Sequence, residues 1–358
     1  MNHISVGLVF KDFAAWVRSS CVGLNVASYA DAKVLRAHGI STFVFPVRHN
    51  VDVVNAIEHH NAAHLHPLTH VIIAAPWLSL YDLKSLIEAY PAIQFVVLCH
   101  SNVGFLQADP EAILLLRRYY HLSHSHGNIK IGGNSKRFVH WLRRAYGFGR
   151  EIVYLPNLYP FEKAPVKQWT GSLPLKIGAF GAVRPEKNFL TAAAAALLIQ
   201  TSLGIPVELH VSRGGEWGSA EVASAVDQMC VHTGVKVIRH DWQYWDKFIQ
   251  VVADMDLLLQ ASYTESFNMI TADGISVGVP SVVSSAIYWA PEAWKADSDD
   301  ATEIAQVGLK LLNGWHADDG VKALAKHNEI GFRYWLRFLG GRPEEKSTWE
   351  KIKFFFRF

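Results

Sequence analysis

Short apolar runs recur along this chain of 358 residues, and segments with helical patterning separate them. Continuous apolar runs are typical of parallel strands that are buried on both faces and connected by helices. The alternation therefore predicts an α/β fold of the doubly wound kind. Strands are expected at residues 5–10, 40–46, 70–75, 93–99, 129–134, 152–155, 175–180, 207–211, 235–238, 255–260 and 281–284.

A proline-containing segment divides this pattern near its middle. Residues 158–174 contain three prolines and lack an apolar period, which is typical of an interdomain linker. The chain length also suits two domains. We therefore expect a Rossmann-like domain at residues 1–160, a linker at 161–174 and a second Rossmann-like domain at 175–330.

The composition is that of a globular, intracellular protein. Half of the residues are apolar, yet no apolar run reaches the roughly 18 to 20 residues that a membrane-spanning helix needs. The first ten residues predict a strand and lack the basic start of a signal peptide, so a cytoplasmic protein is expected. Three distant cysteines, Cys21, Cys99 and Cys230, argue against a disulfide framework. The net charge of +2 does not by itself indicate a polyanionic partner.

Residues 262–280 carry the strongest functional signal. They follow the tenth expected strand and end at Gly278 and Pro280, so they predict a loop and then a helix. Glu265 would then lie at the carboxyl edge of the sheet, where the first amides of the helix can hold an anion. Asp273 follows about two helical turns later and could reach the same crevice. Two acids beside exposed amides suit a sugar nucleotide, because acids bind hydroxyls and amides bind phosphate.

This segment resembles the signature of retaining GT-B glycosyltransferases of the group 1, or family 4-like, type. That signature is a Glu, seven further residues and a second Glu, followed by a helix of small residues that ends in Gly-x-Pro. The resemblance implies that Glu265 contacts the donor sugar and Asp273 the ribose, although Asp is one methylene shorter than Glu. It also implies that the amides of Ser266, Phe267 and Asn268 bind the donor diphosphate. The alternative is that Glu265 is only an acid favoured by the helix dipole and that Asp273 is only an exposed helix residue.

A second loop typical of this family follows the strand expected at 175–180. Gly181 allows the backbone to approach a ligand, and Arg184 and Lys187 place two cations where the next helix begins. In the family, an Arg and a Lys of this loop neutralise the leaving diphosphate. Lys187 matches that pattern, whereas Arg184 fits a variant of it, because Ala182 stands where Arg is commonest. The alternative is a solvated basic turn.

Four further residues match the family less closely. His100 directly follows an expected strand, a position that points into the ligand crevice of an open sheet. The family's His at this place contacts the donor sugar near its reacting carbon. Trp242 lies where the family cups the nucleobase, and it could stack on the base or belong to the core. Ser20 and Gly23 lie in the loop expected after the first strand, which in the family touches donor phosphate or acceptor, but an ordinary helix-entry loop also explains them.

Other histidines gather in two regions of the sequence. Residues 59–70 contain five of them, and residues 121–126 contain three. Their spacing matches no closed zinc pattern and no paired cysteines accompany them, so no metal site is expected. We predict that these histidines lie in surface loops.

Together these features predict a GT-B protein: two doubly wound, Rossmann-like domains facing across a cleft. The resemblance implies a helical tail at 331–358 that packs back on the first, acceptor-side domain. The expected activity is transfer of a hexosyl or pentosyl group from a nucleotide-diphosphate sugar, with retention of configuration and with neither a metal nor a further cofactor. Alternatives are a non-hydrolysing sugar-nucleotide epimerase of the same architecture and a nucleotide- or glycan-binding protein that kept the fold.

The sequence leaves the acceptor open: a glycan, a lipid-linked or small molecule, or a modified base in viral DNA. The last ten residues mix six large apolar side chains with three cations. A helix that is apolar on most sides is normally buried, so we expect this segment to pack on the first domain. A basic, aromatic terminus also suits peripheral contact with a membrane.

Overall fold

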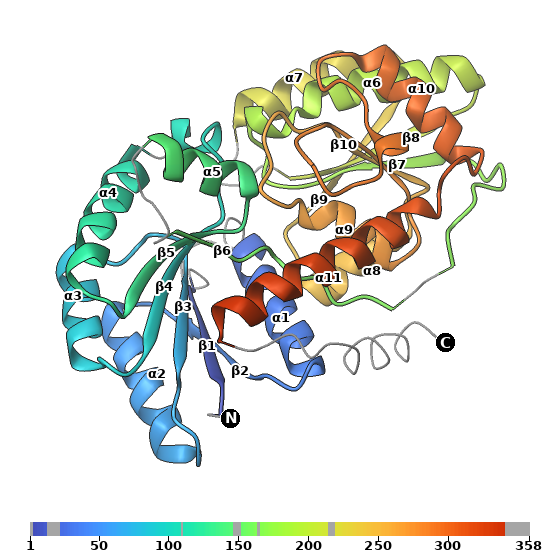
Figure 1. Ribbon diagram of the computed structural model, residues 1–358. Helices are drawn as coiled ribbons and strands as arrows, with labels where there is room; N and C mark the ends of the chain where they lie inside the picture. Colours follow the sequence, from blue (N-terminus) through green and yellow to red (C-terminus); the bar gives the residue numbers. More distant parts are fainter. Residues whose placement is uncertain are drawn as a thin grey trace. The chain divides into compact units, whose positions relative to one another are not determined.

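The computed structural model describes residues 3–12, 22–108, 110–145, 152–162, 165–213 and 219–340. Within these ranges the chain forms two compact units. The first contains residues 3–12, the residues from Gly23 to Pro160 and those from Asn328 onward; the second contains the residues from Phe161 to His327. Each unit is built around one parallel sheet (Figure 1).

The first unit has a six-stranded sheet with the order β2-β1-β3-β4-β5-β6. The strand order reverses at β1, so helices cover both faces, as in doubly wound folds. Its strands are β1 (Ser5–Lys11), β2 (Ser41–Val47), β3 (His70–Ala74), β4 (Gln94–Cys99), β5 (Ile129–Gly133) and β6 (Ile152–Tyr154). Its helices are α1 (Val22–Ala37), α2 (Asn50–Ala63), α3 (Leu80–Ala89), the short η1 (Phe105–Ala108), α4 (Pro110–Ser125) and α5 (Lys136–Ala145).

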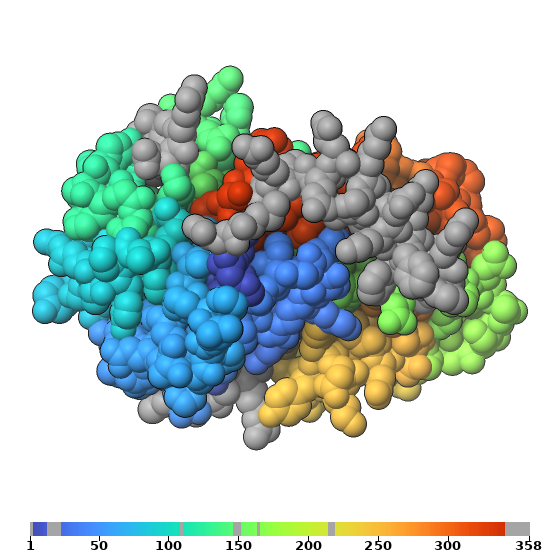
Figure 2. Space-filling model, turned by 60° about the horizontal axis from the view of Figure 1, so that its bottom comes forward, coloured from blue at the N-terminus to red at the C-terminus, as the bar shows by residue number. Residues whose placement is uncertain are grey.

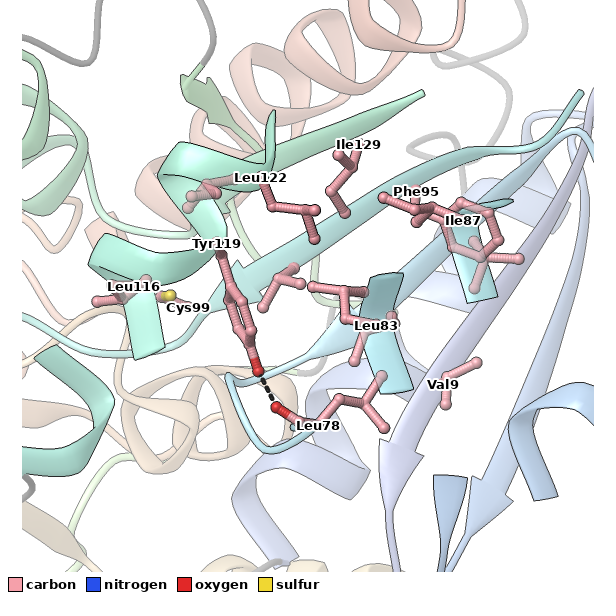
Figure 3. Packing of buried hydrophobic residues seen from close by; sticks show 14 of the residues in the cluster. Val9, Leu78, Leu83, Ile87, Phe95, Cys99, Leu116, Tyr119, Leu122 and Ile129 are labelled. Atoms are coloured by element: carbon pink, nitrogen blue, oxygen red, sulfur yellow. Dashed lines mark hydrogen bonds between the residues drawn. The ribbon is translucent and has the colours of Figure 1, made fainter. Parts of the chain in front are cut away.

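A hydrophobic cluster lies on each face of this first sheet. On one face, strand residues such as Phe95 pack against α2 to α5. Figure 3 shows Tyr119 of α4 in this cluster, where its hydroxyl donates a hydrogen bond to the Leu78 carbonyl. On the other face, α1 packs together with the end of α11 (Asp319–Phe338). Trp335 is fully buried there and donates its indole N–H to the Pro156 carbonyl at 2.9 Å, which holds the last helix against the chain that leaves β6.

The second unit has a five-stranded sheet with the order β11-β10-β7-β8-β9. Its strands are β7 (Leu175–Ala179), β8 (Val207–Ser212), β9 (Lys236–His240), β10 (Leu257–Gln260) and β11 (Ser281–Val283). Its helices are η3 (Pro185–Lys187), α6 (Phe189–Leu203), α7 (Ala220–Cys230), α8 (Trp245–Ala253), α9 (Met269–Ser276), η4 (Glu292–Trp294) and α10 (Ala301–Leu312), and α11 begins here. Alanines form much of the buried face of α6, which packs against α10.

The predicted strands agree with this architecture. Every expected strand occurs, and its ends lie within two residues of the predicted ones. Continuous apolar runs located them because parallel strands are covered on both faces. The doubly wound α/β fold class is confirmed.

No helix was assigned from the sequence between the strands expected at 93–99 and 129–134, where the structure has α4. Its buried residues, Ala112, Leu116, Tyr119 and Leu122, recur at helical spacing, so the signal was present in the sequence. The prediction that the histidines lie in surface loops is wrong for those on helices. His121 and His124 belong to α4, and His59 and His60 to α2.

One residue of the loop expected between the first strand and the first helix belongs to the helix instead. Helix α1 begins at Val22, so Gly23 lies in its first turn and is not a loop residue. Ser20 lies outside the described residues, as does the tail at residues 341–358. In the ranges that the structure describes, no helix is both long and apolar enough to cross a membrane.

Candidate functional site

In the first unit, polar side chains follow three neighbouring strands at the carboxyl edge of the sheet. His100 follows β4, Asn134 follows β5, and Asn157 comes three residues after β6. The amide nitrogen of Asn134 donates to Asn157 Oδ1 at 3.0 Å and lies 3.3 Å from His100 Nδ1. The order β4-β5-β6 therefore brings together side chains that are far apart in the sequence.

His100 is held as a neutral imidazole. Burial lowers the pKa of His100 to about 4. The Asn134 amide nitrogen is a donor, so His100 Nδ1 accepts, and a neutral ring that accepts at Nδ1 carries its proton on Nε2. His100 can thus act as a neutral hydrogen-bond donor at Nε2, but not as a cation at neutral pH.

In the second unit, a lysine and a glutamate from two different loops meet. Lys187 Nζ lies 2.5 Å from Glu265 Oε1. Lys187 is the last residue of η3, and Glu265 lies in the loop between β10 and α9. The Lys187 side chain is 25% exposed and that of Glu265 8%, so the cation keeps access to solvent while the carboxylate is enclosed. Ser262 Oγ and Asn268 Nδ2 donate to the same carboxylate oxygen, at 3.0 and 2.8 Å.

Gly181 lies beside this pair. Its φ of +130° is accessible to glycine but rare for other residues, and its N–H donates to Ser212 Oγ at 3.1 Å. A Cβ at this position would lie 3.7 Å from Lys187 Cε, so the loop backbone passes close to the lysine stem. Ser212 is buried at the end of β8 and was not among the predicted site residues. A polar residue at the carboxyl end of a strand was the available signal.

The loop that carries Glu265 differs from the prediction. Helix α9 begins at Met269, with Asn268 as its N-cap, so Glu265 and Ser266 precede the helix. Asn268 has a φ of 71°, and its Oδ1 accepts from the Thr271 N–H at 2.8 Å. The expectation that the amides just after Glu265 are the first amides of the helix is therefore wrong. An Asn cap satisfies the helix terminus from within the protein.

The side chains of Phe267 and Asn268 point into the protein. Phe267 is 2% exposed and stacks on Trp289, with the ring centroids 5.1 Å apart. The Asn268 side chain holds Glu265 and also donates to Gln260 Oε1 at 3.0 Å. A contact of these two residues with a ligand must therefore come from the backbone. The packing of Phe267 on Trp289 holds this loop in place. The sequence motif did not indicate that Phe267 supports the loop.

Asp273 also has a partner that the sequence did not suggest. Asp273 is 2% exposed, and its carboxylate accepts a hydrogen bond from the indole N–H of Trp245, at 2.9 Å. The sequence suggested that the Asp273 carboxylate is free to reach a ligand. In the structure, Trp245, the first residue of α8, holds it instead. From the sequence, we chose Trp242 and missed Trp245. The two tryptophans are three residues apart, and the sequence does not indicate which of the two indoles points toward α9.

The remaining predicted residues of this unit lie on loops at the same edge of the sheet. Arg184 precedes η3 and is partly exposed, as are Ser266 and Trp242. Lys187, Glu265, Asn268 and Gly181 are the predicted residues that the structure brings together directly. In the part of the chain that the structure describes, no group of three or more His, Cys, Asp or Glu side chains could hold a metal ion.

Comparisons with known proteins found similarity in structure and none in sequence. No protein-family model and no curated protein matches the chain. Sucrose-phosphate synthase from Thermosynechococcus elongatus has a TM-score of 0.62 at 15% identity, covering 95% of this chain and 100% of that one. HepE from Anabaena in complex with UDP-glucose has a TM-score of 0.56 at 13% identity, over 92% of this chain and 95% of that one.

A third similar structure is a variant of TarM from S. aureus in complex with fondaparinux, alpha-GlcNAc-glycerol and UDP. Its TM-score is 0.51 at 14% identity, over 73% of this chain, and the chain spans 58% of the length of TarM. Structural similarity thus extends over most of the chain. The predicted resemblance is confirmed at the level of the fold: this chain has the GT-B fold, with two Rossmann-like parallel sheets.

Proposed function

We propose that this protein is a glycosyltransferase that takes its sugar from a nucleotide-diphosphate sugar bound at the second unit. The observation that carries the proposal is the contact between Lys187 and Glu265 at the carboxyl edge of that sheet, beside Gly181. A cation for phosphate and an acid for sugar hydroxyls meet there at 2.5 Å. HepE, which has the same fold, is described in complex with UDP-glucose.

Each charged residue has a distinct role in this proposal. Lys187 and Arg184 stabilise the negative charge that develops on the diphosphate as the glycosidic bond breaks, and such preorganised charge is usually the largest single contribution to catalysis. Glu265 accepts hydrogen bonds from hydroxyls of the donor sugar. Asp273 accepts from the ribose, in an orientation that Trp245 fixes. Trp242 stacks on the nucleobase.

The first unit supplies the acceptor side and His100. A neutral His100 with its proton on Nε2 donates to the donor sugar near the anomeric carbon without adding a positive charge. We propose that the sugar, a hexose or pentose, is transferred with retention and that the leaving phosphate takes the acceptor proton. The described residues supply cations for the diphosphate, so the proposed mechanism places no metal ion in this role.

The test is a panel of UDP-, GDP- and ADP-sugars read by thermal shift. A ligand that binds only the folded state stabilises it by about 2.7 kcal/mol at 100 times its dissociation constant. One nucleotide class should raise the melting temperature, and Lys187→Ala should remove most of that rise. Lys167→Ala is the matched control, because Lys167 pairs with the buried Asp256 at 3.2 Å, beside the start of β10 at the opposite edge of the same sheet.

Product analysis separates the alternatives. A glycosyltransferase releases nucleoside diphosphate and forms a new glycoside, whereas an epimerase converts one sugar nucleotide into another without an acceptor. Donor binding with neither reaction would identify a binding protein. Absence of any nucleotide-dependent stabilisation in the folded wild-type protein would refute the proposal.

A further inference from the structure

Helices α4 and α5 lie on the same face of the sheet in the first unit. Both helices pack on β5; α4 precedes this strand in the sequence and α5 follows it. Their apolar residues belong to the same buried cluster, with Leu116 and Leu122 from α4 and Phe138 and Leu142 from α5. The two helices therefore cover the same face of the sheet (Figure 1). Their remaining side chains are mostly exposed, and Figure 2 shows this part of the chain at the surface in teal and green.

The outward side of this helix pair is strongly basic. We call it the α4–α5 basic surface. Its exposed basic side chains are Arg117, Arg118, His121, His124, Lys136, Arg137, His140, Arg143 and Arg144. The two helices contain six Arg or Lys and one acid, Glu111, which gives a net charge of +5 in a chain whose net charge is +2.

Neighbouring helices on the same face do not share this charge. Helix α2 carries two acids, Asp52 and Glu58, and no Lys or Arg. Helix α3 carries Asp82 and Glu88 with the single cation Lys84. On this face, the excess of positive charge therefore lies on α4 and α5, and such a concentration of one sign of charge attracts a polyanion.

The residue types indicate the chemistry of the partner. Five of the six cations are arginines, whose planar guanidinium binds phosphate through two parallel hydrogen bonds. Insertion into a lipid bilayer would require exposed apolar side chains, but the apolar sides of both helices are buried in the core. Among the described residues of the two helices, Leu114 is the only exposed large hydrophobic side chain. Phosphate recognition thus outweighs apolar insertion on this surface.

The dimensions suit an extended polymer. At 1.5 Å per residue, the 16 residues of α4 and the 10 of α5 extend about 24 and 15 Å. Duplex DNA carries one phosphate charge per about 1.7 Å of its axis, so several phosphates fit along either helix. Helix α5 begins at Lys136, two residues after Asn134 at the carboxyl edge of the sheet, so the basic surface extends to the edge where His100 lies.

We propose that the α4–α5 basic surface binds the phosphate backbone of a nucleic acid, with duplex DNA as the partner. Binding is electrostatic and independent of base sequence, because arginines on a helix surface contact phosphates without entering a groove. The proposal goes beyond the transferase function and does not rest on it, since DNA binding is measured without any sugar nucleotide.

The test is the salt dependence of binding to a fluorescently labelled duplex, measured by anisotropy with the full chain. Each phosphate contact contributes about −0.9 to the slope of log affinity against log salt concentration. Arg118→Gln/Arg144→Gln should make the slope less steep by about 2 and, at about 0.15 M salt, weaken binding by roughly 30-fold. Both side chains are exposed, and the circular dichroism of the variant should match that of the wild type.

A second double variant is the charge-matched control. Lys33→Gln/Lys84→Gln removes two exposed cations from α1 and α3 and should leave both slope and affinity unchanged. Vesicles with about one third anionic lipid distinguish a membrane from DNA by sedimentation. The proposal is overturned if the wild type fails to bind the duplex at about 50 mM salt, if both double variants change the slope equally, or if vesicles are bound in place of DNA.

Discussion

Replacing Lys187 by Ala should affect stability and turnover in separable ways. In the structure, Lys187 Nζ lies 2.5 Å from a Glu265 carboxylate that is 8% exposed. Removing one partner of a fully buried pair costs about 3–5 kcal/mol, whereas an exposed pair contributes about 0–1 kcal/mol. Lys187 is a quarter exposed, and Ser262 and Asn268 still donate to the same oxygen. We therefore expect the free energy of unfolding to fall by about 2 kcal/mol.

A double-mutant cycle with Glu265→Gln isolates the pair itself. Glu265→Gln keeps the shape of the side chain and removes its charge, so the lysine loses its counterion. If the pair is formed as described, the two single changes should be non-additive by about 1–2 kcal/mol in urea unfolding. A coupling energy below about 0.5 kcal/mol would refute the contact, because residues that do not touch give additive effects.

Turnover distinguishes the catalytic role of Lys187 from its structural one. If Lys187 stabilises charge on the leaving diphosphate, Lys187→Ala should lower the rate of sugar transfer by about 10²–10³-fold. Lys167→Ala should cost comparable stability, because it breaks the pair with the buried Asp256, yet retain near-normal turnover at a temperature where it is folded. Equal losses of turnover in the two variants would contradict the role of Lys187.

Three further predictions concern the supports of the site. Trp245→Phe removes the N–H that donates to the buried Asp273, so it should lower stability by about 1–3 kcal/mol and weaken binding of free nucleoside diphosphate, measured by calorimetry. Gly278→Ala should lower the melting temperature sharply, because φ is +81° and the new Cβ would meet a backbone carbonyl oxygen at 2.0 Å. The pKa of His100 is lowered to about 4, so the unfolded chain binds a proton there more readily between that pH and 6.5. Acidification through this window should therefore cost the wild type up to about 3 kcal/mol of unfolding free energy through this group, a loss that His100→Gln removes.

Each of these predictions has a control in the same chain. Trp169→Phe removes an exposed indole hydrogen bond to the Ser172 carbonyl and should change stability little, so an equal effect would contradict the special role of Trp245. Gly204 has a φ of +65°, but the space around it is open. Gly204→Ala should therefore lower the melting temperature much less than Gly278→Ala. Parallel pH profiles for wild type and His100→Gln would show that His100 does not titrate differently on folding.

The sequence by itself determined the strands and the loops that carry the candidate site. Apolar runs located every strand to within two residues, because burial on both faces of a parallel sheet leaves a continuous hydrophobic signal. The Gly181 loop and the segment around Glu265 were found for the same reason, since each directly follows such a run. The sequence did not indicate where the side chains of these candidate residues point, because a loop has no periodicity that determines side-chain direction.

The tertiary structure alone decided which side chains meet. The Lys187 and Glu265 contact joins residues 78 positions apart, and the Trp245 and Asp273 bond joins residues 28 apart. Such contacts depend on the strand order, which places β10 beside β7 although β8 and β9 lie between them in the sequence. No local pattern encodes that adjacency.

The same reason explains the corrections. The helix was expected to begin directly after Glu265, but packing makes Asn268 its cap and a support for Glu265, while the Phe267 side chain stacks in the core. The basic surface on α4 and α5 was invisible in a net charge of +2, because only the fold gathers its arginines on one face and leaves the compensating acids elsewhere. Sequence therefore fixes which segments fold and which residues are candidates, and packing between distant segments assigns each candidate its partner.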